Sequence, residues 1–195
     1  MLTVRHIEKL WDARKYQPLL EELISPRIEA AVVAELSHTP AAAAMALIRL
    51  DELNLPYAAI CSRLIRALVA LQEADGGWGD IATTALCVRA LSLQNGQGLA
   101  IERGVGYLAN LQQSTGIWPK IPIRRMPEDA LISAFTLYQL IDNEHFRGAV
   151  QFDAACAWFE SHRWSLEPAA QMLWDHARLR APAATTQAAA EPSWS

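Results

Sequence analysis

The stretch "LQEADGGWGD", residues 71–80, separates two apolar, alanine-rich segments that both have the composition of helices. A second stretch, "LQQSTGIWPK" at residues 111–120, keeps the same glutamine, glycine and tryptophan. The three pairs lie 40 positions apart: Gln72 and Gln112, Gly76 and Gly116, and Trp78 and Trp118. Three residue types kept at one offset indicate an internal repeat.

A helix of similar texture follows each tryptophan, at residues 80–93 and 129–141. Aligning Thr84 with Ser133 places Asp80 opposite Asp129, which lies 49 positions further along the chain. The same frame moved back by 40 positions predicts a related helix over residues 43–50. We therefore expect helices of a first kind to begin near residues 40, 80, 128 and 166.

Helices of a second kind are expected between them, over residues 55–72, 99–113 and, less clearly, 148–163. Each repeat is then a helical hairpin of 40 to 50 residues, and roughly three and a half hairpins fit the chain. Apolar residues make up 52% of the sequence, with alanine and leucine dominant and few valine or isoleucine runs. This composition predicts an all-α fold.

The glutamine, glycine and tryptophan of each repeat have a structural interpretation. Gly76 and Gly116 follow the end of a helix, where a left-handed residue is needed and glycine adopts it at the lowest cost. The glutamine one turn earlier can pair with backbone groups at a neighbouring helix end. The tryptophan can stack over that amide and bury a large apolar area. These turns are predicted to join successive hairpins.

These residues belong to a longer pattern of a basic, a small, an aromatic and an aliphatic residue followed by Gln, Gly and Trp. The second copy matches every specified position, with Arg103, Gly104, Tyr107, Leu108, Gln112, Gly116 and Trp118. The first copy has Leu64 and Ala67 in place of the small and aromatic residues, and a degenerate third copy has Arg163 and Glu167 in place of Gln and Gly. The pattern resembles the QW motif of the squalene and hopene cyclase and prenyltransferase superfamily.

The resemblance implies an α/α toroid, with inner helices around a cavity and outer helices packed on them. The helices near residues 40, 80, 128 and 166 would be the inner ones. Complete toroids of this superfamily have five to seven hairpins, so the chain is expected to form an incomplete, half toroid. Residues 39–180 would be the repeat domain, residues 1–38 an irregular helical N-terminal cap, and residues 181–195 a disordered tail.

The candidate catalytic residues are Glu128 and Asp129. The resemblance to class II terpene cyclases implies an Asp-x-Asp-Asp acid at this place, where the chain reads "MPEDAL". A carboxylate beside another can gain a raised pKa and donate a proton. The alternative is structural, because acidic residues are favoured at a helix N-terminus and Asp80 occupies the same repeat position. Adjacent residues on a helix also do not face each other.

No metal or other cofactor is expected. The related protein prenyltransferases bind zinc through an Asp, a Cys two residues later and a distant His, whereas Asp80 and Cys87 here are seven positions apart. The five histidines have no ligand spacing, and no glycine-rich phosphate loop is present in the sequence.

The connection "PKIPIRRMP", residues 119–127, is a candidate binding segment. It concentrates Lys120, Arg124 and Arg125, which can meet a diphosphate or an acidic partner, or can simply form a solvated loop. If the chain is toroidal, this connection lies at the cavity mouth. Four tryptophans at helical spacing are predicted to be core residues rather than a ligand-binding surface: Trp11, Trp158, Trp164 and Trp174.

Charge and cysteine content limit the function classes. The net charge is −4 with scattered basic residues, so no nucleic-acid partner is expected. Three widely spaced cysteines indicate buried free thiols in a reducing, cytoplasmic compartment. No uninterrupted apolar stretch is as long as a transmembrane segment, and the charged N-terminus does not have a signal-peptide pattern.

Three functions remain open. The first is a non-catalytic repeat protein that holds a protein partner, or a second copy of itself, on its concave face. The second is an enzyme or enzyme subunit of isoprenoid metabolism that closes its cavity with a second chain. The third is a carrier of an isoprenoid or another apolar ligand.

Overall fold

The computed structural model describes residues 34, 36, 38–54, 57–94 and 97–181. This part of the chain contains helices and no β-strand, which confirms the predicted all-α fold. The helices are α4 (Pro40–Glu52), α5 (Ala58–Ala70), α6 (Ile81–Leu93), α7 (Gly98–Leu111), α8 (Ala130–Leu140), α9 (Glu144–Ala149), α10 (Phe152–His162), the 3-10 helix η2 (Arg163–Ser165) and α11 (Pro168–Arg180).

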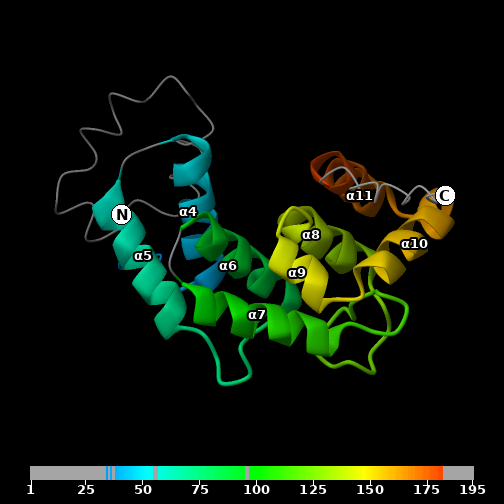
Figure 1. The fold of residues 1–195 in the computed structure, drawn as a ribbon, viewed down its shortest axis with the longest axis horizontal. Coiled ribbons are helices and arrows are strands. Elements are labelled where there is room, and N and C mark those ends of the chain that lie inside the picture. Colours follow the sequence, from blue (N-terminus) through cyan, green and yellow to red (C-terminus); the bar gives the residue numbers. More distant parts are fainter. Residues whose placement is uncertain (1–33, 35, 37, 55–56, 95–96, 182–195) are drawn as a thin grey trace, which may run out of the picture.

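The helices form two layers (Figure 1). In the first layer α4 packs on α6, α6 on α8, and α8 on α11. The second layer follows its outer side, where α5 packs on α4 and α7 on α6. Figure 1 shows the helices of the first layer in the order α4, α6, α8 and α11 from left to right. The layers match the helices of two kinds that the repeat predicted.

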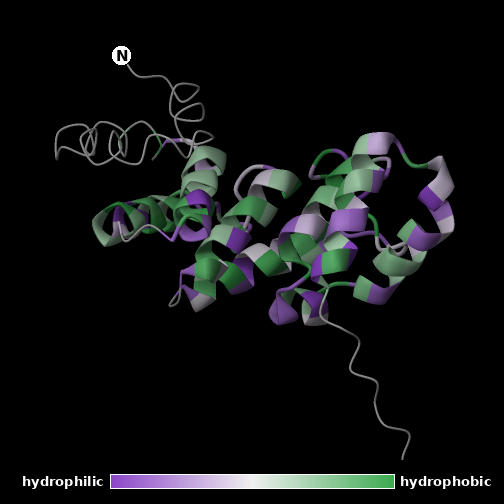
Figure 2. Cartoon of the chain, turned by 90° about the horizontal axis from the view of Figure 1, so that it is seen from above, coloured by the Kyte–Doolittle hydropathy of each residue, from purple (hydrophilic) through white to green (hydrophobic). Residues whose placement is uncertain are grey.

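The difference between the layers follows from the distribution of apolar residues. Helix α6 has neighbours on three sides and buries seven of its residues, including Thr84, Cys87 and Val88. Helix α5 buries only Leu64 and Leu68, which form the narrow apolar stripe of a helix with one covered face. Figure 2 shows hydrophobic residues (green) and hydrophilic residues (purple) on the same helices, as expected for helices that are only partly covered.

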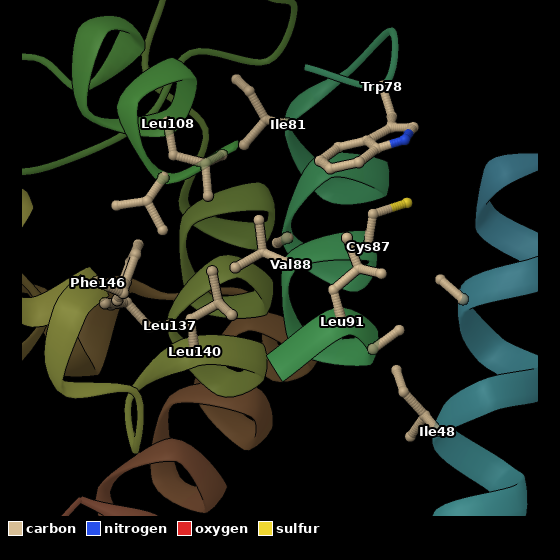
Figure 3. Close-up of a cluster of buried hydrophobic side chains, with 14 of the residues drawn as sticks. Ile48, Trp78, Ile81, Cys87, Val88, Leu91, Leu108, Leu137, Leu140 and Phe146 are labelled. Carbon is tan, nitrogen blue, oxygen red and sulfur yellow. The ribbon is translucent and has the colours of Figure 1, made fainter. Parts of the chain in front are cut away.

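The core lies between the layers and between neighbouring inner helices (Figure 3). Val88 of α6 points toward Leu137 and Leu140 of α8, while Ile48 of α4 approaches α6 from the opposite side. All four side chains are buried. Burial of such aliphatic side chains stabilises a fold by about 1.5 to 3 kcal/mol each.

Three features differ from the sequence prediction or lie beyond it. Helix α9 was not predicted, because six residues are too few to give a periodic pattern; the side chain of its N-cap, Asn143, accepts a hydrogen bond from the Phe146 N–H. The prediction that Trp164 is a core residue is wrong: it lies in η2, outside the packed layers, and is 91% exposed. The predicted tail after Ala181, and all but three residues of the predicted N-terminal cap, including Trp11, lie outside the described residues.

Candidate functional site

The two glutamine-to-tryptophan turns, residues 72–78 and 112–118, have the same internal geometry. Trp78 donates its indole N–H to the Leu68 carbonyl of α5, at 2.8 Å. Trp118 donates to the Leu108 carbonyl of α7, also at 2.8 Å. Each indole therefore satisfies a carbonyl in the last turn of the preceding outer helix, a bond that the sequence did not indicate.

The glutamine side chains close the same turns and reach the next hairpin. Gln72 donates its amide to the Gly76 carbonyl at 2.8 Å and to the Ala100 carbonyl of α7 at 2.9 Å. Gln112 donates to the Gly116 carbonyl at 2.8 Å, and its oxygen accepts the N–H of Gln151, the N-cap of α10, at 2.7 Å. The glutamines thus pair with a neighbouring helix start as predicted.

The two turn glycines are required by both conformation and space. Gly76 has φ +93° and Gly116 has φ +85°, in the left-handed region. A Cβ on Gly76 would lie 2.5 Å from the Arg103 carbonyl oxygen of α7. A Cβ on Gly116 would lie 2.2 Å from the Ala155 nitrogen of α10. The first turn therefore packs directly against the backbone of α7, and the second turn against that of α10.

Three residues of α7 that belong to the second copy of the sequence pattern pack against the first turn. Arg103 donates to the Glu73 carbonyl at 2.7 Å. Gly104 leaves room for Trp78, whose ring would lie 3.0 Å from a Cβ at this position, and the Tyr107 ring packs on Gly77. Burial, with smaller contributions from nearby acidic residues, raises the pKa of Tyr107 to about 12. These residues act in packing between repeats.

The third turn lacks this arrangement. Arg163, which replaces the glutamine, forms an ion pair with Asp175 of α11 at 2.7 Å. Trp174 is buried as predicted and stacks on Phe159 with ring centroids 4.9 Å apart, while Trp158 is partly buried beside Phe159. The repeat pattern therefore ends at α10, where different contacts hold the last helix.

Glu128 and Asp129 both take part in local structure. The Asp129 carboxylate caps α8 and accepts the Ile132 N–H at 2.9 Å. Asp80 caps α6 in the same way, accepting the Thr83 N–H at 2.9 Å. Glu128 is exposed and accepts a hydrogen bond from the Thr115 hydroxyl. The two acids thus have separate hydrogen-bond partners at the start of α8.

The basic connection is an exposed loop. Every residue from Lys120 to Glu128 is exposed, including Arg124 and Arg125. Within the part of the chain that the structure describes, the Lys120, Arg124 and Arg125 side chains make no ion pair and no hydrogen bond. The loop therefore presents three cations to solvent.

The inner layer has a second surface that the sequence did not identify. On each inner helix, side chains that are exposed or half-buried recur at intervals of three or four residues, which places them on one face of that helix. We define this open face by Met45, Arg49 and Glu52 of α4; Leu86, Arg89 and Leu93 of α6; Leu131, Phe135 and Tyr138 of α8, with Asp142 directly after it; and Met172 and His176 of α11.

Polar contacts join the four helices across the open face. Arg89 donates to Gln139 of α8 at 3.1 Å and lies 3.7 Å from the Glu52 carboxylate of α4. Tyr138 of α8 meets His176 of α11 edge to face. Burial, and then the nearby charge of Arg180, lower the pKa of Arg89 from its ordinary value. One feature of the sequence pointed to Arg89: it lies 40 positions after Arg49, which is the offset of the repeat.

A pocket of about 190 Å³ lies at the carboxyl ends of the inner helices. Its lining includes Arg89 and Leu93 of α6, Gln139 of α8, and Arg180 of α11. Arg180 is paired with Asp142, so each arginine of the pocket has a carboxylate close by. The pocket is thus a polar junction between helices, continuous with the open face.

Three further findings concern metal binding, membrane crossing and the cysteines. Among residues 38–54, 57–94 and 97–181, no three side chains of the metal-ligating types gather in one place. Within the same part of the chain, no helix combines the length and apolarity that crossing a membrane requires. Cys61, Cys87 and Cys156 are free thiols. Cys87 is fully buried as predicted, whereas Cys61 and Cys156 are only partly buried, because each lies at the margin of the core.

Comparisons with models of protein families, with curated proteins and with solved structures gave no match to this chain.

Proposed function

We propose that this chain is a non-catalytic repeat protein that holds a protein partner on its open face. The observation that carries the proposal is that each inner helix exposes a large apolar side chain there. Met45 is 46% exposed, Leu93 37%, Leu131 41% and Met172 54%. Apolar side chains shared among several elements on one surface are characteristic of interaction sites.

The charged residues of the open face suit a protein partner. Arg49, Glu52, Arg89 and Asp142 lie among the apolar side chains. A mixture of apolar, aromatic and arginine side chains is the composition found where proteins bind each other. An apolar ligand carrier would instead need a largely apolar enclosed cavity, whereas the pocket beside this face is lined by paired charges.

The role of Asp129 also favours a binding function over isoprenoid chemistry. Its carboxylate caps α8, and the equivalent Asp80 does the same for α6, so helix capping accounts for an acid at this position. An enzyme would need a proton donor elsewhere, or one supplied by a second chain. A resemblance to the α/α-toroid superfamily remains part of the proposal and is supported by the equal geometry of the two turns.

The proposal is tested by photocrosslinking in cells. A photoreactive amino acid at Leu131 or Met172 is expected to form one discrete adduct with a protein. The same substitution at Leu99, which is 72% exposed on α7, serves as the matched control and is expected to form none. Adducts of equal yield at Leu99, or none at Leu131 and Met172, would contradict the open face as the binding surface.

The identified partner is then purified and its affinity measured by calorimetry. Phe135→Ala is expected to weaken binding by about tenfold, the effect of removing one aromatic contact of an interface. Leu99→Ala is expected to have no effect. Turnover of an isoprenoid diphosphate that Asp129→Asn abolishes would favour the enzyme instead, because asparagine still caps a helix and leaves the fold intact.

A further inference from the structure

The inserted loop, residues 119–127, is the largest difference between the two complete repeats. In the first repeat, one residue separates Trp78 from Asp80, whereas residues 119–128 separate Trp118 from Asp129. On either side of the insertion, the tryptophan and the following helix have the same geometry as in the first repeat. The backbone N–H of Trp78 donates to the Thr84 hydroxyl at 3.0 Å, and the backbone N–H of Trp118 donates to the Ser133 hydroxyl at 2.9 Å.

Because both helices keep their places, the insertion is accommodated outside the packed layers, and only Pro119 at its start is buried. All the residues from Lys120 to Pro127 are exposed. Insertions of this kind in repeat proteins map to loops on one face, which is often the face that binds a partner. The loop therefore adds surface without adding to the core.

Backbone bonds hold the inserted loop in one conformation. The Asp129 N–H donates to the Trp118 carbonyl at 2.9 Å, and the Lys120 N–H to the Pro127 carbonyl at 3.2 Å. At the tip, the Met126 N–H donates to the Ile123 carbonyl at 2.9 Å. An ordered loop loses less conformational entropy on binding than a flexible one.

The side chains of the inserted loop combine positive charge with apolar area. Lys120, Arg124 and Arg125 form no ion pair with any described residue, and the loop contains no acidic residue. Ile123 is 55% exposed, and Ile121 and Met126 are also exposed. In a chain with net charge −4, this segment is a local positive patch, and its charge is complementary to a negatively charged partner.

The first turn lies along the same lower edge of the molecule as the inserted loop (Figure 1). Glu73 and Asp75 of this turn are exposed, as is Asp80, the N-cap of α6 that follows it. An extended anionic surface, such as a lipid bilayer, would meet these carboxylates together with the loop and be repelled by them. A short acidic segment can contact the loop alone, so the charge distribution favours a peptide over a membrane.

We propose that the inserted loop binds an acidic segment with interspersed apolar residues, in the protein held on the open face. This inference rests on the proposed function. Arg124 and Arg125 would pair with carboxylates of the segment, and Ile121, Ile123 and Met126 would cover its apolar side chains. Leu131 of the open face follows two residues after Asp129, so one partner can contact both surfaces.

A random dodecapeptide library displayed on phage tests this inference with the 195-residue chain. Peptides selected by the wild-type chain are expected to be enriched in Asp and Glu beside apolar residues. Arg124→Gln with Arg125→Gln is expected to weaken their binding roughly tenfold at low salt, the loss expected for two exposed charge pairs. Arg63→Gln with Arg66→Gln, an equal charge change at exposed positions of α5, is the matched control and is expected to leave it unchanged.

Two further variants test the apolar contribution. Ile123→Ser is expected to weaken peptide binding severalfold, while Leu99→Ser is expected to have no effect. Selected peptides without an acidic excess, equal weakening by the α5 control, or a library that yields no binder would each overturn the proposal. Binding to phosphatidylserine vesicles or to inorganic diphosphate that the Arg124 and Arg125 substitutions abolish, without acidic peptide binding, would also overturn it.

The selection and the crosslinking answer separate questions. Failure of the acidic peptides to depend on Arg124 and Arg125 would overturn the role of the inserted loop and leave the open face unaffected. Failure of crosslinking at Leu131 and Met172 would contradict the proposed function itself. Circular dichroism of each variant checks that the exposed substitutions leave the fold unchanged.

Discussion

Gly116→Ala tests directly whether the turn holds successive hairpins together. The substitution introduces a Cβ at a residue with φ +85°, where a side chain costs about 1 to 2 kcal/mol. The new Cβ would also lie 2.2 Å from the Ala155 nitrogen and 2.6 Å from its Cα, both backbone atoms of α10. Helix α10 must shift to relieve this contact, and such overpacking costs about 1 to 3 kcal/mol. The expected total loss is about 2 to 5 kcal/mol.

The assay is urea unfolding followed by far-ultraviolet circular dichroism, with Gly106→Ala as the control. Gly106 lies inside α7, and a Cβ there would meet no atom within 4 Å. Alanine in a helix interior is more stable than glycine by about 0.5 to 1 kcal/mol, so this variant is expected to gain stability. The two glycine-to-alanine changes should therefore have opposite signs.

Gly76→Ala is expected to repeat the loss, because its Cβ would lie 2.5 Å from the Arg103 carbonyl oxygen at φ +93°. If Gly116→Ala were as stable as the wild-type chain, the contact between the turn and α10 would not hold the repeats together. The reasoning on the turns would then be refuted.

Three other predictions concern single side chains. Trp118→Ala should lower the free energy of unfolding by about 3 to 5 kcal/mol, whereas Trp164→Ala, at a side chain that is 91% exposed, should change it little; chemical denaturation measures both. Asp129→Ala should cost about 1 kcal/mol through loss of the α8 cap, and Asp129→Asn should cost almost nothing. Burial, and then the charges of Asp153 and Glu160, raise the pKa of Cys156 from 9.0 to about 11, so the folded chain keeps this proton after the unfolded chain has released it. The stability from Cys156 is thus complete below about pH 9 and lost as pH rises toward 11, and Cys156→Ser should flatten the decline in denaturation midpoint over that range.

The repeat was predictable because its signal lies in residue types with special geometry. Glycine at a left-handed position and tryptophan over a turn each occupy places that few other residues can take. The alignment of Thr84 with Ser133 also corresponds to a shared contact. Each hydroxyl accepts a hydrogen bond from the backbone N–H of the tryptophan that precedes it in the chain. The all-α fold followed from these turns and from the composition.

The open face could not be read from the sequence in the same way. The inner helices have apolar residues on nearly every side, so periodicity does not distinguish the exposed stripe from the buried ones. The position of Trp164 was predicted wrongly because helical spacing alone does not show that the third turn loses its packing partners. Arg89 and Arg180 meet only through tertiary structure, since they are far apart in the chain.

The most direct test of the account is the solution mass of the purified protein, measured by light scattering after gel filtration. The proposed function needs an open face that is free to receive a partner. It therefore predicts a monomer of 21.6 kDa. A stable dimer of twice that mass, with photocrosslinks between copies at Leu131 and Met172, would contradict the account. It would show that a second copy covers the open face, and would favour an enclosed cavity instead.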